Sequence, residues 1–444
     1  MIQNIEILIE EKKYSELKKE LIKLNEADIA EILENLNELE LITIFRLLPK
    51  DLAALVFSYL SIENEQVIIK ALSDKEAAQI IDNMYADDAA DLIDEMPSNV
   101  VKRLLSNTTK ETRRDINNLL KYEEDSAGSI MTVEFIDLKE NYNVKDALDR
   151  IKKDANHIEN FDICYVLDHT RKLLGYVKLK DILINEENTS IKTLMRKVHV
   201  KVSTKTDQEI VAHKFKKYDI NLMPVVDSEN KLVGIITIDD IVDIIDEETT
   251  EDIEKMAAIT PNDKPYNKTG VFQTYIKRIP WLLLLMISAT FTGKIIQSYE
   301  KALASYVVLT SFIPMLMDTG GNAGSQASVT IIRSLSLNEI KFKDIFKVIF
   351  KEIRVAILIG ITLAVANFFK LMIIDGVSIT IAFIVCLTLI ITVLCAKIVG
   401  STLPMAAKKI GFDPAVMASP FITTIVDAIS LIIYFTIATN LLAL

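Results

Sequence analysis

The C-terminal stretch PAVMASPFITTIVDAISLIIYFTIATNLLAL (414–444) decides the fold of this chain. Its 31 residues carry one charge, Asp427, and are otherwise apolar or weakly polar. That length is enough for a helix to cross a bilayer. A carboxylate near the middle of such a helix costs about 2.5–3.5 kcal/mol on insertion scales, so it needs a polar surrounding. We interpret Asp427 as a cation ligand facing a water-filled path; a structural pairing with a neighbouring helix is the alternative.

The rest of the chain divides by composition into two parts. Residues 1–270 are dense in Lys, Glu and Asp, whereas residues 271–444 hold only 14 Lys and Arg between long apolar runs. This pattern predicts a soluble part followed by a membrane part. The formal net charge of −12 argues against nucleic acid as a partner, because phosphate binding needs a basic surface. The N-terminus shows no signal-peptide pattern, so we expect no cleaved secretory segment.

We predict five membrane spans. They cover residues 280–296, 302–332, 355–369, 377–396 and 414–444. Cytoplasmic segments of membrane proteins carry an excess of Lys and Arg. With the soluble part placed inside, the inner segments hold eleven basic residues and the outer segments hold three. We therefore expect the N-terminal domains in the cytoplasm and the C-terminus on the extracytoplasmic side.

The second predicted span has the features of an interrupted helix. Pro314 lacks an amide donor, and TGGNAGS (319–325) is a poor helix centre. Irregular backbone at membrane depth persists only where it lines a cavity or is buried in protein. We therefore expect freed carbonyl groups there to coordinate a cation or its water shell. A kink that only shapes packing is the alternative.

The last span places oxygen atoms in one column. Ser419, Thr423 and Asp427 are four residues apart and share one helix face. Pro420 frees a carbonyl near Val416. The column is a candidate wall of an ion pathway.

The first 127 residues have a helical pattern. LLPKDLAALVFSYL, LSDKEAAQIIDNM and MYADDAADLIDEM share a polar start, an acid, an Ala-rich step and paired apolar residues. The recurring acid is Asp51, Glu76 and Asp88. Ser73 or Asp74 is the expected N-cap of the second unit. The pattern predicts a superhelical stack of short helices, whose handedness it leaves open.

Residues 130–250 contain a duplication. Strand-like runs ICYVL (163–167) and GYVKL (175–179) return as MPVV (223–226) and GIITI (234–238). The matching landmarks are 59 residues apart: Asp168 with Asp227, Gly175 with Gly234, and Asp181 with Asp240. A strand–strand–helix unit is therefore expected twice.

A run of nine acids without Lys or Arg follows, between positions 239 and 254. On a helix, like charges three or four residues apart repel unless a cation lies between them. Oxygen ligands suit Mg²⁺ or Ca²⁺ rather than zinc or copper. A solvated acidic face is the alternative, but the position before the membrane part favours a divalent cation site.

The duplicated stretch resembles two tandem cystathionine-β-synthase (CBS) domains, which are regulatory ligand-binding modules; a plain dimerisation module is the alternative. Together with YEEDSAGSIMT (122–132), PMLMDTGGNAGSQAS (314–328) and DPAVMASPFITTIVDAISLIIYF (413–435), the chain resembles the MgtE family of magnesium channels over nearly its whole length. The resemblance implies an all-α N-terminal superhelical domain, an α/β tandem CBS pair and an α-helical five-span transmembrane domain.

The resemblance also implies domain boundaries. They are an N-terminal helical domain at 1–129, CBS domains at 130–190 and 191–246, an acidic connecting (plug) helix and linker at 247–270, and a transmembrane domain of five helices at 271–444.

Site residues carried over from the family fall into two groups. The pore group is Asp427, Thr423, Ser419, Asn322 and Asp413. The cytosolic Mg²⁺-sensing group is Asp87, Asp88, Asp91, Asp207, Glu209, Asp219, Asp240, Asp243, Glu248, Glu251 and Asp252. The family further implies a homodimer in the plasma membrane whose ion path lies at the interface, and it raises ATP as a ligand of the CBS pair, although no residue here decides this.

The expected function is Mg²⁺ uptake through a channel that the membrane potential drives and cytosolic Mg²⁺ closes. One alternative is an ion-coupled secondary transporter of another divalent metal such as Mn²⁺ or Co²⁺. Another is a membrane-tethered signalling protein that binds nucleotide and conducts nothing. We expect no enzyme, because the sequence contains no Ser/His/Asp, Cys/His or P-loop arrangement. The three cysteines lack metal-type spacing and are expected to be packing thiols.

Overall fold

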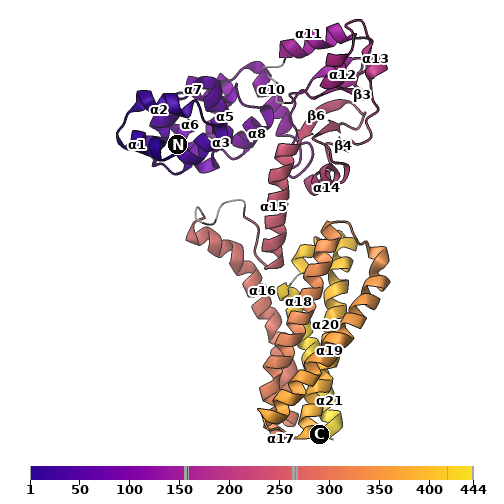
Figure 1. The fold of residues 1–444 in the computed structure, drawn as a ribbon. Helices are drawn as coiled ribbons and strands as arrows, with labels where there is room; N and C mark the ends of the chain where they lie inside the picture. The colour runs from indigo at the N-terminus through magenta and orange to yellow at the C-terminus, as the bar shows by residue number, and fades with distance from the viewer. Residues whose placement is uncertain are drawn as a thin grey trace. The chain divides into compact units, whose positions relative to one another are not determined.

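The fold is described from a computed structural model that covers residues 2–154, 158, 160–262, 266, 269–417 and 419–442. It consists of two compact units, Met1–Ile245 and Asp246–Leu444, which are described separately (Figure 1). The first unit contains a helical part and two small sheets, and the second is helical throughout its described residues. This organisation confirms the expected fold class; the number of membrane spans stays a prediction.

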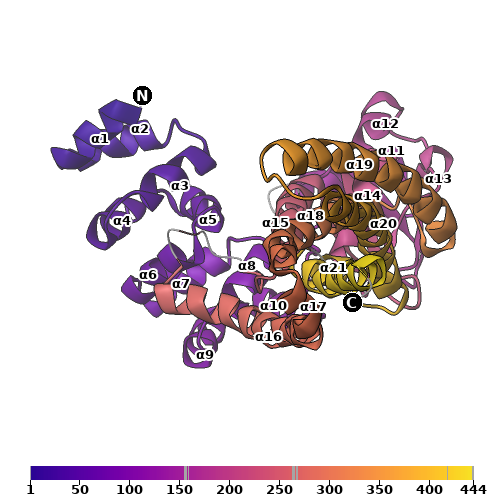
Figure 2. The ribbon, with the colours of Figure 1, turned by 90° about the horizontal axis from the view of Figure 1, so that it is seen from below.

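The first unit begins with ten short helices that follow one another in a stack (Figures 1 and 2). They are α1 (Ile2–Glu10), α2 (Tyr14–Leu21), α3 (Glu26–Glu34), α4 (Glu38–Phe45), α5 (Lys50–Ser58), α6 (Ile62–Ala71), α7 (Asp74–Ile81), α8 (Ala86–Asp94), α9 (Ser98–Asn107) and α10 (Lys110–Leu119). Buried Ile, Leu, Ala and Phe side chains from nearly all of them form one core that continues into the second sheet. The helices are short because polar caps recur, as the sequence pattern predicts.

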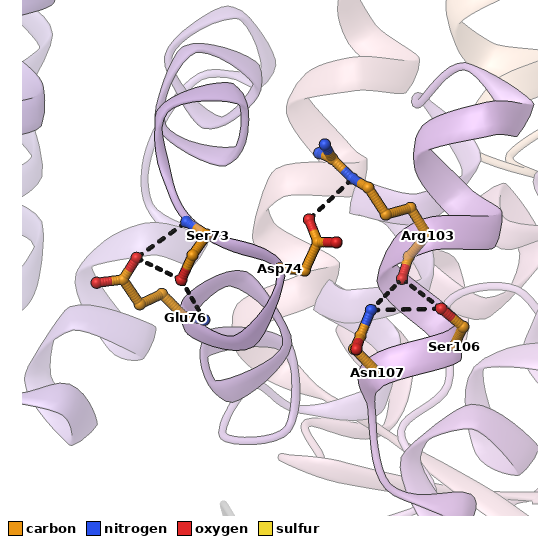
Figure 3. A network of polar contacts seen from close by, with 6 residues as sticks. All are labelled: Ser73, Asp74, Glu76, Arg103, Ser106 and Asn107. Atoms are coloured by element: carbon orange, nitrogen blue, oxygen red, sulfur yellow. Dashed lines mark hydrogen bonds and ion pairs between the residues drawn. The ribbon is translucent and has the colours of Figure 1, made fainter.

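Helix α7 shows how the caps work (Figure 3). The Ser73 hydroxyl accepts a hydrogen bond from the Glu76 amide at 3.3 Å, and the Glu76 carboxylate accepts one from the Ser73 amide at 2.9 Å. This capping box satisfies two amides that have no partner within the helix. An ion pair between Arg103 and Asp74 at 3.3 Å joins α9 to the same turn. The prediction of a cap at Ser73 is confirmed.

The part of the chain expected to form the two CBS domains, which we call the CBS part, contains two three-stranded sheets of the same design. The first has the order β1 (Asp137–Lys139), β2 (Ile163–Leu167), β3 (Leu173–Lys178), and the second has β4 (Val202–Ser203), β5 (Leu222–Val226), β6 (Leu232–Thr237). In each sheet the first pair is parallel and the second antiparallel. The accompanying helices are α11 (Val144–Asp154), α12 (Leu179–Ile184), α13 (Ile191–Leu194) and α14 (Gln208–Tyr218).

The two β-hairpins repeat each other in detail. Asp168 accepts hydrogen bonds from two amides of its loop at 2.7 and 2.9 Å, and Asp227 does so at 2.9 and 2.8 Å. Arg171 and Asn230 occupy the left-handed region at φ 66° and 65°. All of these pairs are 59 residues apart, so the predicted duplication is confirmed. Helix α15 (Ile238–Met256) then carries the acidic run as one continuous helix.

The second unit contains long helices and the short helix α17, and 3-10 turns precede α18, α19 and α21. The helices are α16 (Val271–Ser298), α17 (Glu300–Ser305), α18 (Ile313–Ser336), α19 (Ile345–Ile373), α20 (Ile379–Lys409) and α21 (Ser419–Leu442). Among the described residues, four segments are long and apolar enough to cross a membrane: Val271–Ser298, Phe342–Ile373, Ile379–Lys409 and Pro414–Leu442. Helix α18 packs against α20 and α21 (Figures 1 and 2). Pro280 lies inside α16 rather than at the start of the first helix, which begins at Val271.

The predicted interruption at 319–325 is wrong. Helix α18 runs without a break through the glycine-rich stretch, and Pro314 lies in its first turn, where a missing amide costs nothing. The irregular backbone precedes it, as a 3-10 helix over Val307–Phe312. Glycine lowers helix propensity, but tertiary packing overrides that preference here. The carbonyl groups of 319–325 therefore lie within a regular helix.

Packing explains why this stretch is rich in glycine. A side chain at Gly400 of α20 would overlap the carbonyl oxygen of Gly324. A Cβ at Gly320 would lie 2.9 Å from the Ser430 hydroxyl, and one at Gly321 would lie 2.5 Å from the Thr423 methyl group. The backbone of α18 thus touches its neighbours directly, as in small-residue contacts between membrane helices.

Substitution of Gly400 by alanine is expected to destabilise the second unit. The added methyl group has to displace the α18 backbone, so we expect a loss of about 1–3 kcal/mol, seen as a lower melting temperature of the full chain in detergent. Gly293 of α16 is the matched control, since its Cβ would meet nothing within 4 Å. An equal melting temperature for Gly400→Ala and wild type would contradict the close packing.

Candidate ion pathway and acidic clusters

Asp427 lies in the first half of α21 and is half-buried in the second unit. Thr423, one turn earlier, is also half-buried, and its hydroxyl donates to the Pro420 carbonyl at 3.0 Å. The side chain of Ser419 lies outside the described part of the structure. Among the described residues, no hydrogen bond or ion pair of the Asp427 carboxylate is found. The carboxylate is therefore available for a ligand from outside the chain.

Helix α18 presents a polar stripe. Asp318, Asn322 and Gln326 are exposed and succeed one another at intervals of four residues, so they share one face. The charge of Asp318 acts on Asp427, which places the two carboxylates near each other. Two acids of like charge in apolar helices repel unless a cation lies between or beside them. Asn322 was expected in the pathway, whereas Asp318 was not among the predicted site residues.

Asp413 lies in the loop before α21 and contacts the end of α15 within the second unit. Its carboxylate accepts a hydrogen bond from the Ala415 amide at 2.8 Å and forms an ion pair with Lys255 at 2.7 Å. Lys255 also pairs with Glu251 at 2.5 Å. Burial opposes the charge of Lys255, but the hydrogen bonds to both carboxylates outweigh it and raise the pKa of Lys255.

Asp252 lies beside this arrangement. The Ser336 hydroxyl of α18 donates to its carboxylate at 3.4 Å. Burial, followed by the nearby charge of Asp413, raises the pKa of Asp252. Three of the predicted sensing acids, Glu248, Glu251 and Asp252, thus belong to the segment of α15 in the second unit. Glu251 and Asp252 lie close to Asp413.

A second group of acids lies in the first unit, where α6 and α8 approach the CBS part; we call it the interdomain acid cluster. Its members are Glu65, Asp88, Glu134 and Asp240. The Ala86 amide of α8 donates to Glu134 at 3.1 Å, which ties the helical part to the CBS part. The Thr237 hydroxyl donates to Asp240 at 2.5 Å.

The interdomain acid cluster concentrates negative charge. Burial raises the pKa of Glu65 to about 8, with added repulsion from Asp88 and Asp91. Burial and the charges of Asp240 and Glu134 raise the pKa of Asp88 to about 6. Burial is also the first cause of the raised pKa values of Asp240 and Glu134. Each of these groups would be stabilised in its charged form by a cation.

The remaining predicted sensing residues are dispersed. Asp87 and Asp91 accompany Asp88 on α8, and Asp243 is exposed on α15. Asp207 caps α14 by accepting from the amides of Glu209 and Ile210 at 3.0 and 3.3 Å. Asp219 ends the same helix in the left-handed region, at φ 50°. In the part of the chain that is described, no three acidic, histidine or cysteine side chains converge tightly enough to hold a metal ion.

A cavity of about 560 Å³ opens between the two CBS sheets. Its lining combines aromatic rings, cations and acids: Tyr165, Tyr176, Lys178, Lys180, Asp162 and Asp219. The volume is typical of a small-molecule site. Rings can stack on a base, lysines can pair with phosphates, and carboxylates can accept from ribose hydroxyls. The donor set therefore fits a nucleotide.

Sequence reasoning missed Glu65, Glu134 and Asp318. Glu65 carried a signal, because it shares a helix face with Ile68 and Ile69, and an acid on an apolar face is rare. Glu134 follows the quoted motif 122–132, but its approach to α8 depends on tertiary packing. Asp318 became relevant only when α18 proved to be a regular helix.

Apolar helices that carry unpaired carboxylates, joined to a CBS pair and a helical domain, define a membrane transport protein with a regulatory part. Comparisons specify the class. The chain matches the family models for the MgtE divalent cation transporter at 313–437, the MgtE intracellular N domain at 24–125 and the CBS domain at 127–186 and 191–247. It belongs to the MgtE family.

Two relatives indicate the extent of the similarity. The magnesium transporter MgtE of Thermus thermophilus is 34% identical over 341 residues, which are 77% of this chain and 75% of that protein. The magnesium transporter MgtE of Bacillus subtilis is 35% identical over 335 residues, 76% of this chain and 74% of that protein.

Two solved structures of soluble domains resemble part of this chain. The soluble part of a magnesium transporter has a TM-score of 0.52 and 28% identity, covering 56% of this chain and 97% of that one. The cytosolic domain of the Mg²⁺ channel MgtE in complex with ATP has a TM-score of 0.52 and 31% identity, covering 55% of this chain and 100% of that one.

The interdomain acid cluster predicts a pH-dependent stability. The folded-state pKa of Glu65 lies above its ordinary value of 4.5, at about 8. The contribution of Glu65 to the free energy of unfolding is therefore most favourable below its unfolded-state pKa and is lost as the pH rises toward 8. Glu65→Gln removes this loss, so it is expected to raise the free energy of unfolding by on the order of a few kcal/mol at alkaline pH and little at acidic pH.

The measurement is the melting temperature of the full chain without divalent cations at about pH 5.5 and about pH 8.5. Glu31→Gln on the exposed face of α3 is the control. A gain of equal size at both pH values would show that the carboxylate is not destabilised by its surroundings.

Proposed function

We propose that this chain is a Mg²⁺-selective channel that admits Mg²⁺ across the plasma membrane and is closed by cytosolic Mg²⁺. Membership of the MgtE family, and the relatives named magnesium transporter, support Mg²⁺ as the transported ion. The single observation that carries the channel proposal is the pair of carboxylates, Asp318 and Asp427, on adjoining helices that otherwise span apolar surroundings.

The pathway in this proposal lies between α18 and α21 of two protomers. Asp427, Thr423 and Asn322 offer oxygen atoms on one side, Ser419 extends the column, and Asp413 lies at its inner mouth. Mg²⁺ prefers six oxygen ligands and sheds water reluctantly, so it passes in hydrated form and contacts these oxygens through its water shell. One Asp427 from each protomer of a homodimer balances the charge of one ion.

The membrane potential supplies the driving force in this proposal. A divalent ion gains roughly 4.6 kcal/mol per 100 mV of inside-negative potential, so influx needs no coupled reaction. The eleven basic residues assigned to inner segments support an orientation with the N-terminal helical part and the CBS part in the cytoplasm and the C-terminus outside.

Closure rests on the acids of the soluble part. Mg²⁺ bound at Asp87, Asp88, Asp91 and Asp240 would offset the repulsion that raises the pKa values of the interdomain acid cluster. Asp207, Glu209, Asp219 and Asp243 extend the sensing surface, and Glu248, Glu251 and Asp252 continue it along α15. When cytosolic Mg²⁺ falls, the acids repel and the closed arrangement loosens.

ATP is the proposed ligand of the CBS cavity. The cavity's tyrosines, lysines and acids fit a nucleotide, and the ATP complex of a relative's cytosolic domain supports this assignment. Nucleotide there would contact both CBS domains and so couple the energy state of the cell to gating.

A coupled transporter of Mn²⁺ or Co²⁺ is the second candidate, because the family model describes divalent cations in general. Such a transporter would use the same acids with alternating access. Flux in liposomes separates the two: a channel gives voltage-dependent Mg²⁺ flux that is independent of pH and Na⁺ gradients.

Asp427→Asn is expected to abolish Mg²⁺ uptake, because the permeating ion loses the only charge in the column. Growth of a host that lacks its own Mg²⁺ transporters, at low external Mg²⁺, measures the effect. Asp318→Asn should reduce uptake less, since Asp318 lies on the exposed face rather than beside Thr423. Asp375→Asn is the control, because that carboxylate pairs with Lys370 at 3.1 Å outside the column. Full growth of the host with Asp427→Asn would contradict the proposed ion pathway.

Neutralising Asp240, Asp243, Glu248 and Glu251 together should leave the channel conducting at millimolar Mg²⁺, because bound ions no longer join the cytosolic parts. Patch-clamp recording with graded Mg²⁺ on the cytosolic side is the measurement. A variant with four exposed acids neutralised elsewhere, at Asp28, Glu31, Glu186 and Glu187, controls for the change in net charge. Unchanged closure in the first variant would refute the sensing assignment.

A further inference from the structure

Four cations lie at the start of α19 and on the 3-10 turn Phe342–Asp344 that leads into it; we call them the basic stripe. They are Lys343, Lys347, Lys351 and Arg354, all of them exposed. At 100° per residue Lys347, Lys351 and Arg354 of α19 fall within an arc of roughly 60°, and Lys343 lies about one turn before Lys347. A general excess of basic residues at cytoplasmic ends does not require that they share a face. The arrangement therefore calls for a further explanation.

The same face becomes apolar further along the helix. Leu358, Ile361 and Val365 follow the basic stripe and are 70%, 50% and 52% exposed. Two exposed aromatic rings, Phe346 and Phe350, border it at 81% and 64% exposure. In a membrane this apolar continuation faces acyl chains, because α19 is one of the helices long and apolar enough to span it.

Little of the positive charge is neutralised within the chain. Lys347 forms an ion pair with Asp344 at 3.3 Å, and Arg354 lies over the Phe350 ring at 5.8 Å. Lys343 and Lys351 form no hydrogen bond or ion pair with any described residue. The opposite face of α19 is packed, with Val348 and Glu352 buried. The charges are thus presented outward and available.

We propose that the basic stripe is a docking surface for anionic phospholipids of the cytoplasmic leaflet. Lys343 to Arg354 spans about 16 Å along the helix, which covers the headgroup layer and the water just beyond it. One lipid can therefore place its acyl chains along Leu358 and Ile361 and its phosphate among the cations of the same face. Lys409, whose ammonium lies 4.1 Å from the Phe342 ring centroid, adds charge at the end of the stripe.

The proposal does not depend on the transported ion, so it can be tested without transport. Full-length protein in neutral detergent is mixed with dioleoyl-phosphatidylglycerol or dioleoyl-phosphatidylcholine, and retained lipid is counted by native mass spectrometry. Phosphatidylglycerol should bind preferentially and resist displacement by inorganic phosphate. Lys343→Gln, Lys347→Gln and Lys351→Gln together should weaken its binding by about fivefold for each charge removed.

Two matched variants complete the test. Arginine at the same three positions keeps the charge and should keep the lipid, which separates loss of binding from loss of folding. Glutamine at Lys18, Lys19 and Lys70, which are exposed on α2 and α6, removes equal charge elsewhere and should change nothing. Equal retention of both lipids by wild type, or undiminished phosphatidylglycerol binding by the glutamine variant at positions 343, 347 and 351, would overturn the proposal.

Discussion

Direct backbone contact between α18 and its neighbours is the constraint on which the second unit depends. The backbone at Gly324 leaves no room for a side chain at Gly400, a Cβ at Gly324 would lie 2.9 Å from the Ile422 side chain, and Gly321 lies against Thr423. Helices in a bilayer gain little from burying apolar surface, so close packing of small residues has to hold them together. This contact fixes the polar stripe of α18 beside the carboxylate of α21. The candidate pathway is therefore a consequence of glycine packing.

The two groups of acids are balanced in different ways. Asp413 is held by the ammonium group of Lys255, so that part of the second unit already contains its cation. In the interdomain acid cluster, burial and the negative charges of neighbouring acids raise the pKa values of Glu65 and Asp88. A bound divalent cation would therefore relieve more electrostatic repulsion at the acids of the first unit than at Asp413. In the proposed function this difference makes the interdomain acid cluster the strongest part of the sensing surface, which Glu248, Glu251 and Asp252 continue along α15.

Much of the fold was predictable because it follows from local patterns. Apolar runs and turn residues located β2 and β5, the interval of 59 residues revealed the duplicated hairpins, and Ser73 with Glu76 marked a helix start. The glycine-rich segment was misjudged, since the low helix propensity of glycine is outweighed where another helix must approach its backbone closely. Pro280 was misjudged for a similar reason, because it lies within a helix that begins earlier.

By itself, the sequence determined the soluble and membrane parts, the paired sheets and the position of Asp427 in an apolar helix, because composition and periodicity are local properties. The tertiary structure decided which distant groups meet: Glu65 with Asp88, Asp88 with Asp240, Lys255 with Asp413, and Asp318 with Asp427. These encounters depend on how helices pack against one another. No short-range pattern of the sequence shows that packing. Which residues come into contact depends on the shapes of the helix surfaces that form only on folding.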